Sequence, residues 1–550
     1  MAEGKQANLD FNNQGTFTYN QPTYPTYPQG NQTGFVNSGF QSDDNQKSGT
    51  MPQPMYPRTT FVSQPPQHIM NNRNDSYCER LYTHRRQTGS IIGGLLLMIV
   101  SGLHIGWGIW RIFFVAGFSA SVDLLTFMII TWSLGGFIGA FFGAFLTPIL
   151  RKNIIYCVTA SIMLIGNLLL IIWDGETAAI IVGRIILGAA HGAVFVTLIT
   201  HAGENAAHNM RGTVVSTLNA SLYAGIFVSV VLSGTVRFIW QNPVTLSAER
   251  IIGILGALIS ALSIICSLIA TVETIPFLLY RNDRVNAMTN LKFLRDAPFE
   301  TSELKQELDE FDVMIAQDKQ NSGNIFTNGN GKPLLLMTMM RLMVALTNNV
   351  LINVIAITFS TQLLSVFNIR LVPLIVVAPR LGMALIQIFY ADVFKRKLQI
   401  FLSAASAATV IILFGILLNT LTAFTFRDLY VHGILFAVLW LIFQFSCGIG
   451  MDQMQDVYLS EAFSTAKKPW SIAFVTAFEH LFHIFMIGMY RVDITTSVQL
   501  NALIFCTGIV VLLIAVILVF TLPETRRVSL RSARDLFANR SNHFIMSPFA

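Results

Sequence analysis

Charged residues are scarce in this chain of 550 residues. Only 12% of them are Asp, Glu, Lys or Arg, whereas 53% are hydrophobic and the mean hydropathy is +0.56. A soluble globular protein carries about 25% charged residues. The shortage of charge therefore argues against an ordinary soluble protein and places the chain in the membrane class.

Cysteine is also scarce, and chemical motifs are missing. The five cysteines, Cys78, Cys157, Cys266, Cys447 and Cys506, are far apart, and all but Cys78 fall in apolar runs. This spacing fits neither a disulfide framework nor a metal site. The sequence has no recognisable nucleophile–base pair or phosphate loop, so we expect no enzyme activity, no metal and no cofactor. The polar amino terminus does not resemble a cleavable signal peptide.

What the chain does have is long apolar runs. A run of about 20 apolar residues is long enough to cross the hydrocarbon core as a helix. Twelve such runs lie near 89–110, 122–146, 153–173, 178–202, 213–236, 250–271, 333–360, 370–391, 398–422, 431–458, 470–490 and 498–522. The sequence therefore predicts an all-α membrane protein with twelve transmembrane helices.

The net charge of +6 does not indicate a surface that binds nucleic acid, because the basic residues concentrate in alternate loops. In such loops they set the orientation of the chain in the membrane. The positive-inside rule puts that side, and both termini, in the cytoplasm. We expect a multi-pass protein of the plasma membrane. The basic residues on the predicted cytoplasmic side are Arg80, Arg85, Arg86, Arg151, Lys152, Arg211, Lys395, Arg396, Lys397, Lys467, Lys468, Arg526, Arg527 and Arg531.

Two segments differ from the apolar runs. Residues 1–76 are rich in Gln, Asn, Pro, Gly, Tyr and Ser, which predicts a disordered cytoplasmic tail. Its Pro/Tyr repeats could dock an adaptor, although a solvated tail is the commoner meaning of such a composition. Residues 273–332 are polar, with helical periodicity over 283–295 and 302–318.

Within that polar segment, Ala287, Leu291 and Leu294 share one helix face, and Leu304, Leu308 and Phe311 share another. Thr301 or Ser302 can cap the second helix. The organisation that we predict is a tail at 1–76, a six-helix half at 89–272, a cytoplasmic helical linker at 273–332, a second six-helix half at 333–522 and a cytoplasmic tail at 523–550.

One charge pattern occurs twice at helix ends. Glu204 precedes Arg211 by seven residues, and Glu461 precedes Lys468 by seven. Each pair lies between two apolar runs, so the repeat indicates two related halves. We expect these charges to pair across the halves when one membrane face is closed, and to separate when it opens.

The motifs around these pairs resemble the sugar-porter branch of the major facilitator superfamily over roughly 89–532. They are Gly183-Arg184, Gly188, Gly192, Glu204, Arg211-Gly212, Glu273-Thr274, Asp392 with Arg396 and Lys397, and Pro523-Glu524-Thr525-Arg526. Gly106-Trp107 is similar to insect trehalose and glucose transporters. The resemblance implies two pseudo-symmetric halves and a gate of Arg184, Glu204, Arg211, Asp392, Arg396, Glu461, Lys468, Glu524 and Arg526. Arg151 and Lys152 depart from the motif, so we expect them to anchor a helix end among lipid headgroups.

The residues that would bind a sugar are partly replaced. Asn219 stands where the family has a glutamine, Thr347 and Asn348 replace a glutamine pair, and Asn353 retains the family's asparagine. The resemblance implies that these four line the site. His104 and His191 lie among small apolar residues, where we expect packed, hydrogen-bonded histidines.

The second half, in contrast, has ionisable residues inside its predicted helices. Arg380, Asp452, Asp456, Glu479 and His480, with His483 one turn later, fall inside predicted helices. An ionisable group in a membrane helix usually faces a cavity or a partner. These residues could bind a solute or couple transport to protons. Alternatively, Arg380 and Asp452 could form an ion pair that only joins two helices.

These observations predict a carrier that moves a sugar or a similar polyhydroxylated solute by alternating access. Asp and Glu are missing from Gly106-Trp107-Gly108, where proton-coupled sugar porters have an aspartate, which favours facilitated diffusion. One alternative is a carrier of an organic ion or a proton-coupled polar solute that uses the charges of the second half. Another is a non-transporting nutrient sensor.

Overall fold

The computed structural model describes residues 85–114, 122–239, 247–320, 324–326, 329–348, 352, 372–420, 426–491 and 497–538. The predicted tail at 1–76 and the candidate site residue Asn353 lie outside these ranges. Within them the regular structure is helical throughout and contains no strand. The all-α prediction is therefore confirmed.

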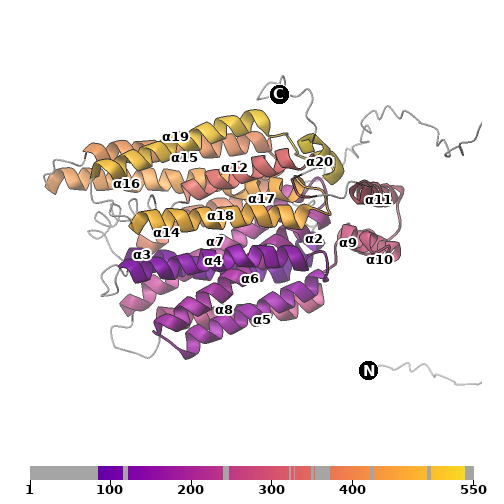
Figure 1. Cartoon of the computed structure of the whole chain (residues 1–550), viewed down its shortest axis with the longest axis horizontal. Helices are drawn as coiled ribbons and strands as arrows, with labels where there is room; N and C mark the ends of the chain where they lie inside the picture. The colour runs from indigo at the N-terminus through magenta and orange to yellow at the C-terminus, as the bar shows by residue number, and fades with distance from the viewer. Residues whose placement is uncertain are drawn as a thin grey trace, which may run out of the picture. The chain divides into compact units, whose positions relative to one another are not determined.

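The first half of the bundle consists of six long helices (Figure 1). A short helix α2 (Arg85–Ser90) leads into them. They are α3 (Ile92–Phe114), α4 (Val122–Leu146), α5 (Lys152–Ile172), α6 (Thr177–Asn205), α7 (Arg211–Ile239) and α8 (Ala248–Ala270). They pack mainly as the pairs α4–α6, α3–α7 and α5–α8.

Glycines allow the closest of these pairs to form. Gly139 and Gly143 of α4 face Ala189 and Ala193 of α6, and Gly192 of α6 faces the α4 backbone. At each of the three glycines a Cβ would collide with backbone atoms of the facing helix. Small residues let helix backbones approach where lipid provides no hydrophobic driving force between helices.

The second half begins with α12 (Gly331–Thr347) and α14 (Val372–Tyr390). It continues with α15 (Arg396–Thr420), α16 (Phe426–Ser446), a π-helical turn η2 (Cys447–Met451), α17 (Asp452–Glu461), α18 (Lys468–Arg491) and α19 (Ser497–Thr521). Helices α16, η2 and α17 follow one another without a break and form one apolar span, Val431–Glu461. A π-helical turn inside a helix is common at functional sites, and this one directly precedes Asp452.

Ten of the described helices are long and apolar enough to cross a membrane. A shorter apolar segment of α14, Val377–Tyr390, coincides with the eighth predicted run, and α12 forms the first part of the seventh, whose later part lies almost wholly outside the described residues. The chain is thus a multi-pass helical protein. The full count of twelve remains a prediction.

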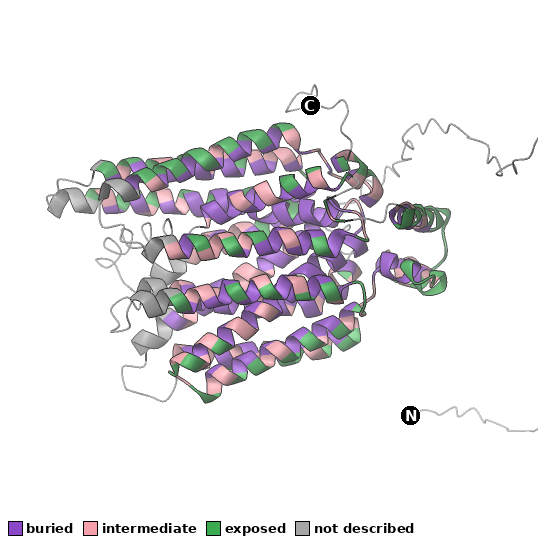
Figure 2. Ribbon diagram, in the orientation of Figure 1, coloured by how far each residue is buried: buried purple, intermediate pink, exposed green. Residues whose placement is uncertain are grey.

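The surface of the bundle is apolar, and its interior combines a hydrophobic core with many buried polar residues. Large hydrophobic side chains such as Leu258, Leu268 and Ile269 are exposed, the last by 81%. Figure 2 shows exposed residues along the outer faces of the helices and buried ones between them. Buried residues include many arginines, carboxylates and histidines. Apolar side chains on the outside suit contact with lipid, and buried ionisable side chains suit a hydrated path inside the bundle.

Three linker helices lie at one end of the bundle, which we call the linker side (Figure 1). They are α9 (Ile275–Tyr280), α10 (Arg284–Leu294) and α11 (Ser302–Gln320). The sequence predicted α10 and α11 but not the short α9. The predicted apolar faces of α10 and α11 are buried, in a small core of their own that also includes Leu530. The Thr301 hydroxyl accepts a hydrogen bond from the Leu304 amide, so Thr301 is the cap.

The last described helix, α20 (Leu530–Ala538), packs on this linker side too. Its Arg534 pairs with Asp318 of α11 at 2.7 Å, and its Phe537 ring contacts Tyr458 of α17 edge to face. The two halves of the bundle meet chiefly through α4 with α18 and α7 with α14. The candidate site lies between those contacts.

Candidate functional site

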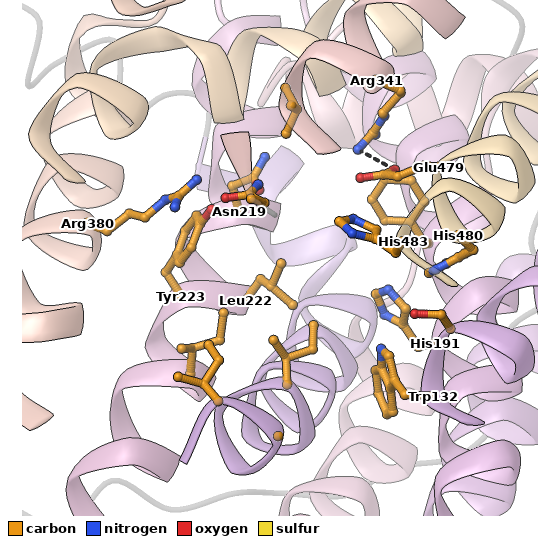
Figure 3. A pocket seen from close by; sticks show the side chains of 18 of the residues that line it. Trp132, His191, Asn219, Leu222, Tyr223, Arg341, Arg380, Glu479, His480 and His483 are labelled. Carbon is orange, nitrogen blue, oxygen red and sulfur yellow. Dashed lines mark ion pairs between the residues drawn. The ribbon is translucent and has the colours of Figure 1, made fainter. Parts of the chain in front are cut away.

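A cavity of about 300 Å³ lies between the two halves (Figure 3). Helices α3, α4, α6 and α7 of the first half line it, as do α12, α14, α16, α17 and α18 of the second. Its polar and aromatic lining comprises Trp132, Ser133, Arg184, His191, Phe195, Asn219, Tyr223, Arg341, Asn348, Arg380, Trp440, Gln444, Gln455, Asp456, Thr476, Glu479, His480 and His483.

Arg380 and Asp452 form the ion pair that the sequence suggested as one alternative. Two guanidinium nitrogens of Arg380 each lie 2.8 Å from a carboxylate oxygen of Asp452. Tyr223, from the other half, donates its hydroxyl hydrogen to the same carboxylate at 2.9 Å. All three are buried or nearly so, and Arg380 also faces the cavity. The pair joins α14 to α17, and of its two members only Arg380 lines the cavity.

A second cation, Arg341 of α12, was missed in the sequence. It forms an ion pair with Asp456 of α17, and another of its nitrogens lies 3.2 Å from Glu479 of α18. Its guanidinium also lies 4.9 Å from the ring of Phe195 in the first half. The reasoning that identified Arg380, a charge inside an apolar run, applies equally to Arg341.

Among the predicted sugar-binding residues, Asn219 and Asn348 line the cavity and Thr347 does not. The Asn219 amide donates hydrogen bonds to Asp456 and, at 2.8 Å, to the carbonyl oxygen of Asp452. Its nitrogen therefore links the halves, and neither of these hydrogen bonds uses its oxygen. The Thr347 hydroxyl donates to its own helix, at Val344.

Several uncharged polar atoms in the wall have no hydrogen-bond partner in the described protein. They are both ring nitrogens of His480, Nδ1 of His191, Nε1 of Trp440, Oε1 of Gln455 and Oγ1 of Thr476. A buried polar group without a partner costs about 1–3 kcal/mol. These atoms are themselves buried, and the side chains that carry them line the cavity.

The two histidines expected to be packed and hydrogen-bonded differ. His104 bonds the side-chain oxygen of Asn167 at 3.0 Å, as predicted. His191 is packed as predicted, because it is buried and its ring stacks on Trp132, but it also lines the cavity and its Nδ1 has no hydrogen bond. It also meets His480 of the second half edge to face, at 6.1 Å between ring centres. The sequence could not show that α18 would bring another histidine there.

On the linker side the predicted gate residues form ion pairs across the halves. Arg211, at the start of α7, lies 3.0 Å from Glu461 at the end of α17. Arg396 approaches the same carboxylate at 2.7 Å and also pairs with Asp392 at 3.0 Å. Asp392 in turn accepts the backbone amides of Gly212 and Thr213, where the α7 dipole favours a carboxylate.

The second pair is looser. Lys468 lies 3.8 Å from Glu204, and neither the Lys468 nitrogen nor Oε1 of Glu204 has a hydrogen bond. Each acid in the duplicated pattern thus pairs with the base of the other half, not with the base seven residues further along. The two pairs differ in strength although their sequence pattern is the same.

Glu524 and Arg526 do not contact the other half through any bond that the described structure shows. Glu524 accepts the Lys397 amide at 3.3 Å and so caps α15, while Arg526 donates to the carbonyl of Val393. In the first half, Glu273 caps α5 in the same way by accepting the Lys152 amide at 2.8 Å. These matching caps reflect two related halves.

Lys152 corrects one expectation. It was expected among lipid headgroups, but its side chain is only 2% exposed and pairs with Glu273 at 3.0 Å. Arg184, expected in the gate, lies about 30 Å along α6 from Glu204 at 1.5 Å per residue. It lines the cavity, donates to the carbonyl of Met128 at 2.8 Å and lies over the Trp107 ring.

Two helical halves pack around a polar cavity and are joined by ion pairs at one end, which is the architecture of membrane carriers that work by alternating access. The comparisons with known proteins agree. Residues 67–537 match the family model "Sugar (and other) transporter". The chain therefore belongs to this transporter family, and the resemblance to sugar porters is confirmed.

The fold is also that of solved sugar porters. The structure of the proton:xylose symporter XylE bound to 6-bromo-6-deoxy-D-glucose superposes with a TM-score of 0.70 at 17% identity, over 83% of this chain and 99% of that one. A partially occluded inward-open XylE from E. coli gives 0.61 at 16% identity, over 81% and 98%.

A third relative is similar over a shorter segment. The high glucose sensor RGT2 of Saccharomyces cerevisiae is 31% identical over 178 residues, 31% of this chain. The match spans 22% of the sensor's length.

Proposed function

We propose that this protein carries a neutral, polyhydroxylated solute of about monosaccharide size across the plasma membrane. Asn219, Asn348, Gln455, Thr476 and His480 would bond its hydroxyl groups. A cavity of about 300 Å³ is at the lower end of the usual range for small-molecule sites, which favours a single sugar ring.

The observation that carries this proposal is that the charged groups at the cavity pair with one another, whereas several uncharged polar groups do not have a partner among the described residues. The carboxylates Asp452, Asp456 and Glu479 each contact a guanidinium, whereas several amide, hydroxyl, indole and imidazole groups have no protein partner. A site for an organic ion needs a charge that is available to it. A site for a sugar needs neutral donors and acceptors beside aromatic rings, and Trp132, Phe195, Tyr223 and Trp440 supply the rings.

The gate residues are arranged as a transport cycle with alternating access would require. With Arg211–Glu461 and Lys468–Glu204 paired, the linker side is closed, and we propose that it faces the cytoplasm with both termini. The solute then enters from outside. Rocking of the halves separates these pairs and opens the linker side.

Uptake into proteoliposomes tests the proposal. We expect saturable entry of a labelled neutral monosaccharide, and competition by other neutral sugars but not by organic cations or anions. Replacing His480 and Gln455 with Leu should lower uptake at least tenfold, since two lost hydrogen bonds of about 1 kcal/mol each suffice for that. Ser406→Ala, on the outer face of α15, is the control. Uptake of an organic ion in place of sugar would contradict the proposal.

A nutrient sensor is a second candidate, and the similarity to RGT2 favours it. A sensor of this fold would bind the sugar in the same cavity without moving it. Tryptophan fluorescence would then report sugar binding by the purified chain, through Trp132 and Trp440, while proteoliposomes show no uptake.

A further inference from the structure

Arginines surround one serine just after the last described membrane helix. The chain reads Arg526-Arg527-Val528-Ser529-Leu530, and Arg531 follows. Arginines two and three residues before a serine, with an apolar residue after it, form the pattern that arginine-directed serine kinases select, because acidic groups in their substrate grooves bind the two guanidinium groups. None of the gate or cavity contacts described above uses the Ser529 hydroxyl. The pattern therefore indicates a site of phosphorylation.

The serine lies where an enzyme in the aqueous phase can reach it. Residues 523–529 form no helix, and Ser529 directly precedes α20 on the linker side (Figure 1). Arg527 is exposed, and Ser529 is half-buried with its hydroxyl bonded to the exposed Ser532 at 3.1 Å. Because α20 has only nine residues, its helical structure is marginal by itself and its first turn can open to bind an enzyme.

The same spacing of arginines occurs at a second place, Arg85-Arg86-Gln87-Thr88, but in a different setting. Thr88 lies inside α2, which leads into α3 after a single residue, and a glycine follows it instead of an apolar residue. The Gln87 side chain is buried and bonds to the backbone of Ala207 and Leu294. This segment is therefore held in place and does not suit the groove of a kinase.

Ser529 also lies next to a gate residue. The Arg211 guanidinium donates to Glu461 at 3.0 Å and to the carbonyl oxygen of Val528 at 3.3 Å. Arg211 is buried, and its Nε has no hydrogen-bond partner among the described residues. The gate arginine thus has an unused donor while it contacts the residue that precedes Ser529.

We propose that Ser529 is phosphorylated by an arginine-directed serine kinase, and that the phosphate holds the linker side closed. The Ser529 oxygen attacks the γ-phosphorus of ATP, the bond from that phosphorus to ADP breaks, and the hydroxyl proton passes to the kinase. The inference rests on the proposed function, which puts the linker side in the cytoplasm, where ATP is present.

The phosphate strengthens a contact between the halves. It carries a charge of about −1.5 to −2 at pH 7, and the amino end of α20 favours such a charge. Arg211 belongs to the first half. The loop that carries Ser529 is attached to the second half, where the Tyr458 hydroxyl donates to the Pro523 carbonyl at 2.9 Å. The attraction between the phosphate and Arg211 is strongest while the linker side is closed, so it favours that state.

Transfer of labelled phosphate to the purified full chain in detergent tests the site without any sugar. The probe is the catalytic subunit of cyclic-AMP-dependent protein kinase, which selects arginines at these two positions, with γ-labelled ATP. We expect mass spectrometry to find the phosphate on Ser529, and the label to be lost in Ser529→Ala and retained in Ser532→Ala, the matched exposed serine. If Ser529→Ala does not fold, the peptide map of the wild type still decides. No transfer, or transfer to other residues alone, overturns the proposal.

Uptake of a labelled monosaccharide by proteoliposomes tests the effect on the gate, with the chain phosphorylated or untreated before reconstitution. We expect phosphorylation to lower uptake at least about fivefold in the wild type and in Ser532→Ala, which is the low end for coupled sites. Kinase treatment should leave uptake by Ser529→Ala unchanged. Equal uptake by phosphorylated and untreated wild type would contradict the effect on the gate and leave the proposed function intact. No uptake by either would contradict the proposed function, while the phosphate map would still decide the site.

Discussion

At the scale of single residues, the charged side chains at the cavity pair with one another, whereas several uncharged polar atoms have no hydrogen-bond partner among the described residues. Arg380 and Asp452 satisfy each other with two hydrogen bonds of 2.8 Å, which is the geometry that makes an arginine–carboxylate pair strong. Removing one partner of a buried pair leaves an uncompensated charge and costs about 3–5 kcal/mol. Removing both partners together leaves no uncompensated charge.

This difference gives a test of what Arg380 does. Arg380→Gln alone should lower stability by about 3–5 kcal/mol, whereas Arg380→Gln with Asp452→Asn should recover most of it. Thermal unfolding in lipid measures both. Sugar uptake should return with the double substitution if the pair only positions α14 against α17. Uptake that stays lost in a stable double variant would show that the charge itself is needed by the solute.

The contacts of individual side chains are also what the sequence predicted least completely. Arg380, Asp452 and Glu479 could be found because a charge in an apolar run is unusual, and Arg341 could have been found in the same way. Their partners could not be assigned, because pairing depends on which helices become neighbours. The crossed pairing of Glu204 with Lys468 and Arg211 with Glu461 joins residues more than 200 positions apart.

At the scale of helices, close packing of α4 on α6 positions one wall of the cavity. Trp132 comes from α4 and His191 from α6, and they stack only because the two backbones touch through glycine. A Cβ on Gly139 would fall on the backbone of Ala189, which cannot rotate away.

Gly139→Ala should therefore destabilise the protein, by about 1–3 kcal/mol as for other overpacked cores. Gly382→Ala in α14 is the matched control, because a Cβ there meets no atom within 4 Å. Alanine favours a helix by about 1 kcal/mol over glycine, so the control should be neutral or more stable. Unfolding temperatures in lipid measure the contrast. Equal effects at the two positions would mean that the α4–α6 contact is not tight.

Helices themselves were largely predictable. The periodic faces of 283–295 and 302–318 correspond to α10 and α11, and the apolar runs correspond to the long helices within a few residues except at the end of α12. The exceptions are informative. The π-helical turn η2 and the short helix α9 depend on packing rather than on composition. Hydropathy alone does not reveal either.

At the scale of the whole molecule, the two halves are related but not equivalent. Glu273 and Glu524 cap corresponding helices, α5 and α15, which reflects the shared ancestry that the repeated motif indicated. The links between the halves are uneven, with 3.0 Å between Arg211 and Glu461 and 3.8 Å between Lys468 and Glu204. Glu461 accepts Arg211 from the first half and Arg396 from its own half, so we expect its removal to weaken the contacts that hold the linker side together.

The most direct test of the account is the distance between the halves on the linker side. Spin labels at Arg151 and Phe394, both exposed, can be introduced as cysteines after the native cysteines are replaced. In the unliganded protein we predict mainly the shorter distance. A longer one should gain population when Glu461→Gln removes the shared acceptor, and a transported sugar should shift the balance between the two. A single distance, unchanged by Glu461→Gln and by every sugar that is taken up, would contradict alternating access through this gate.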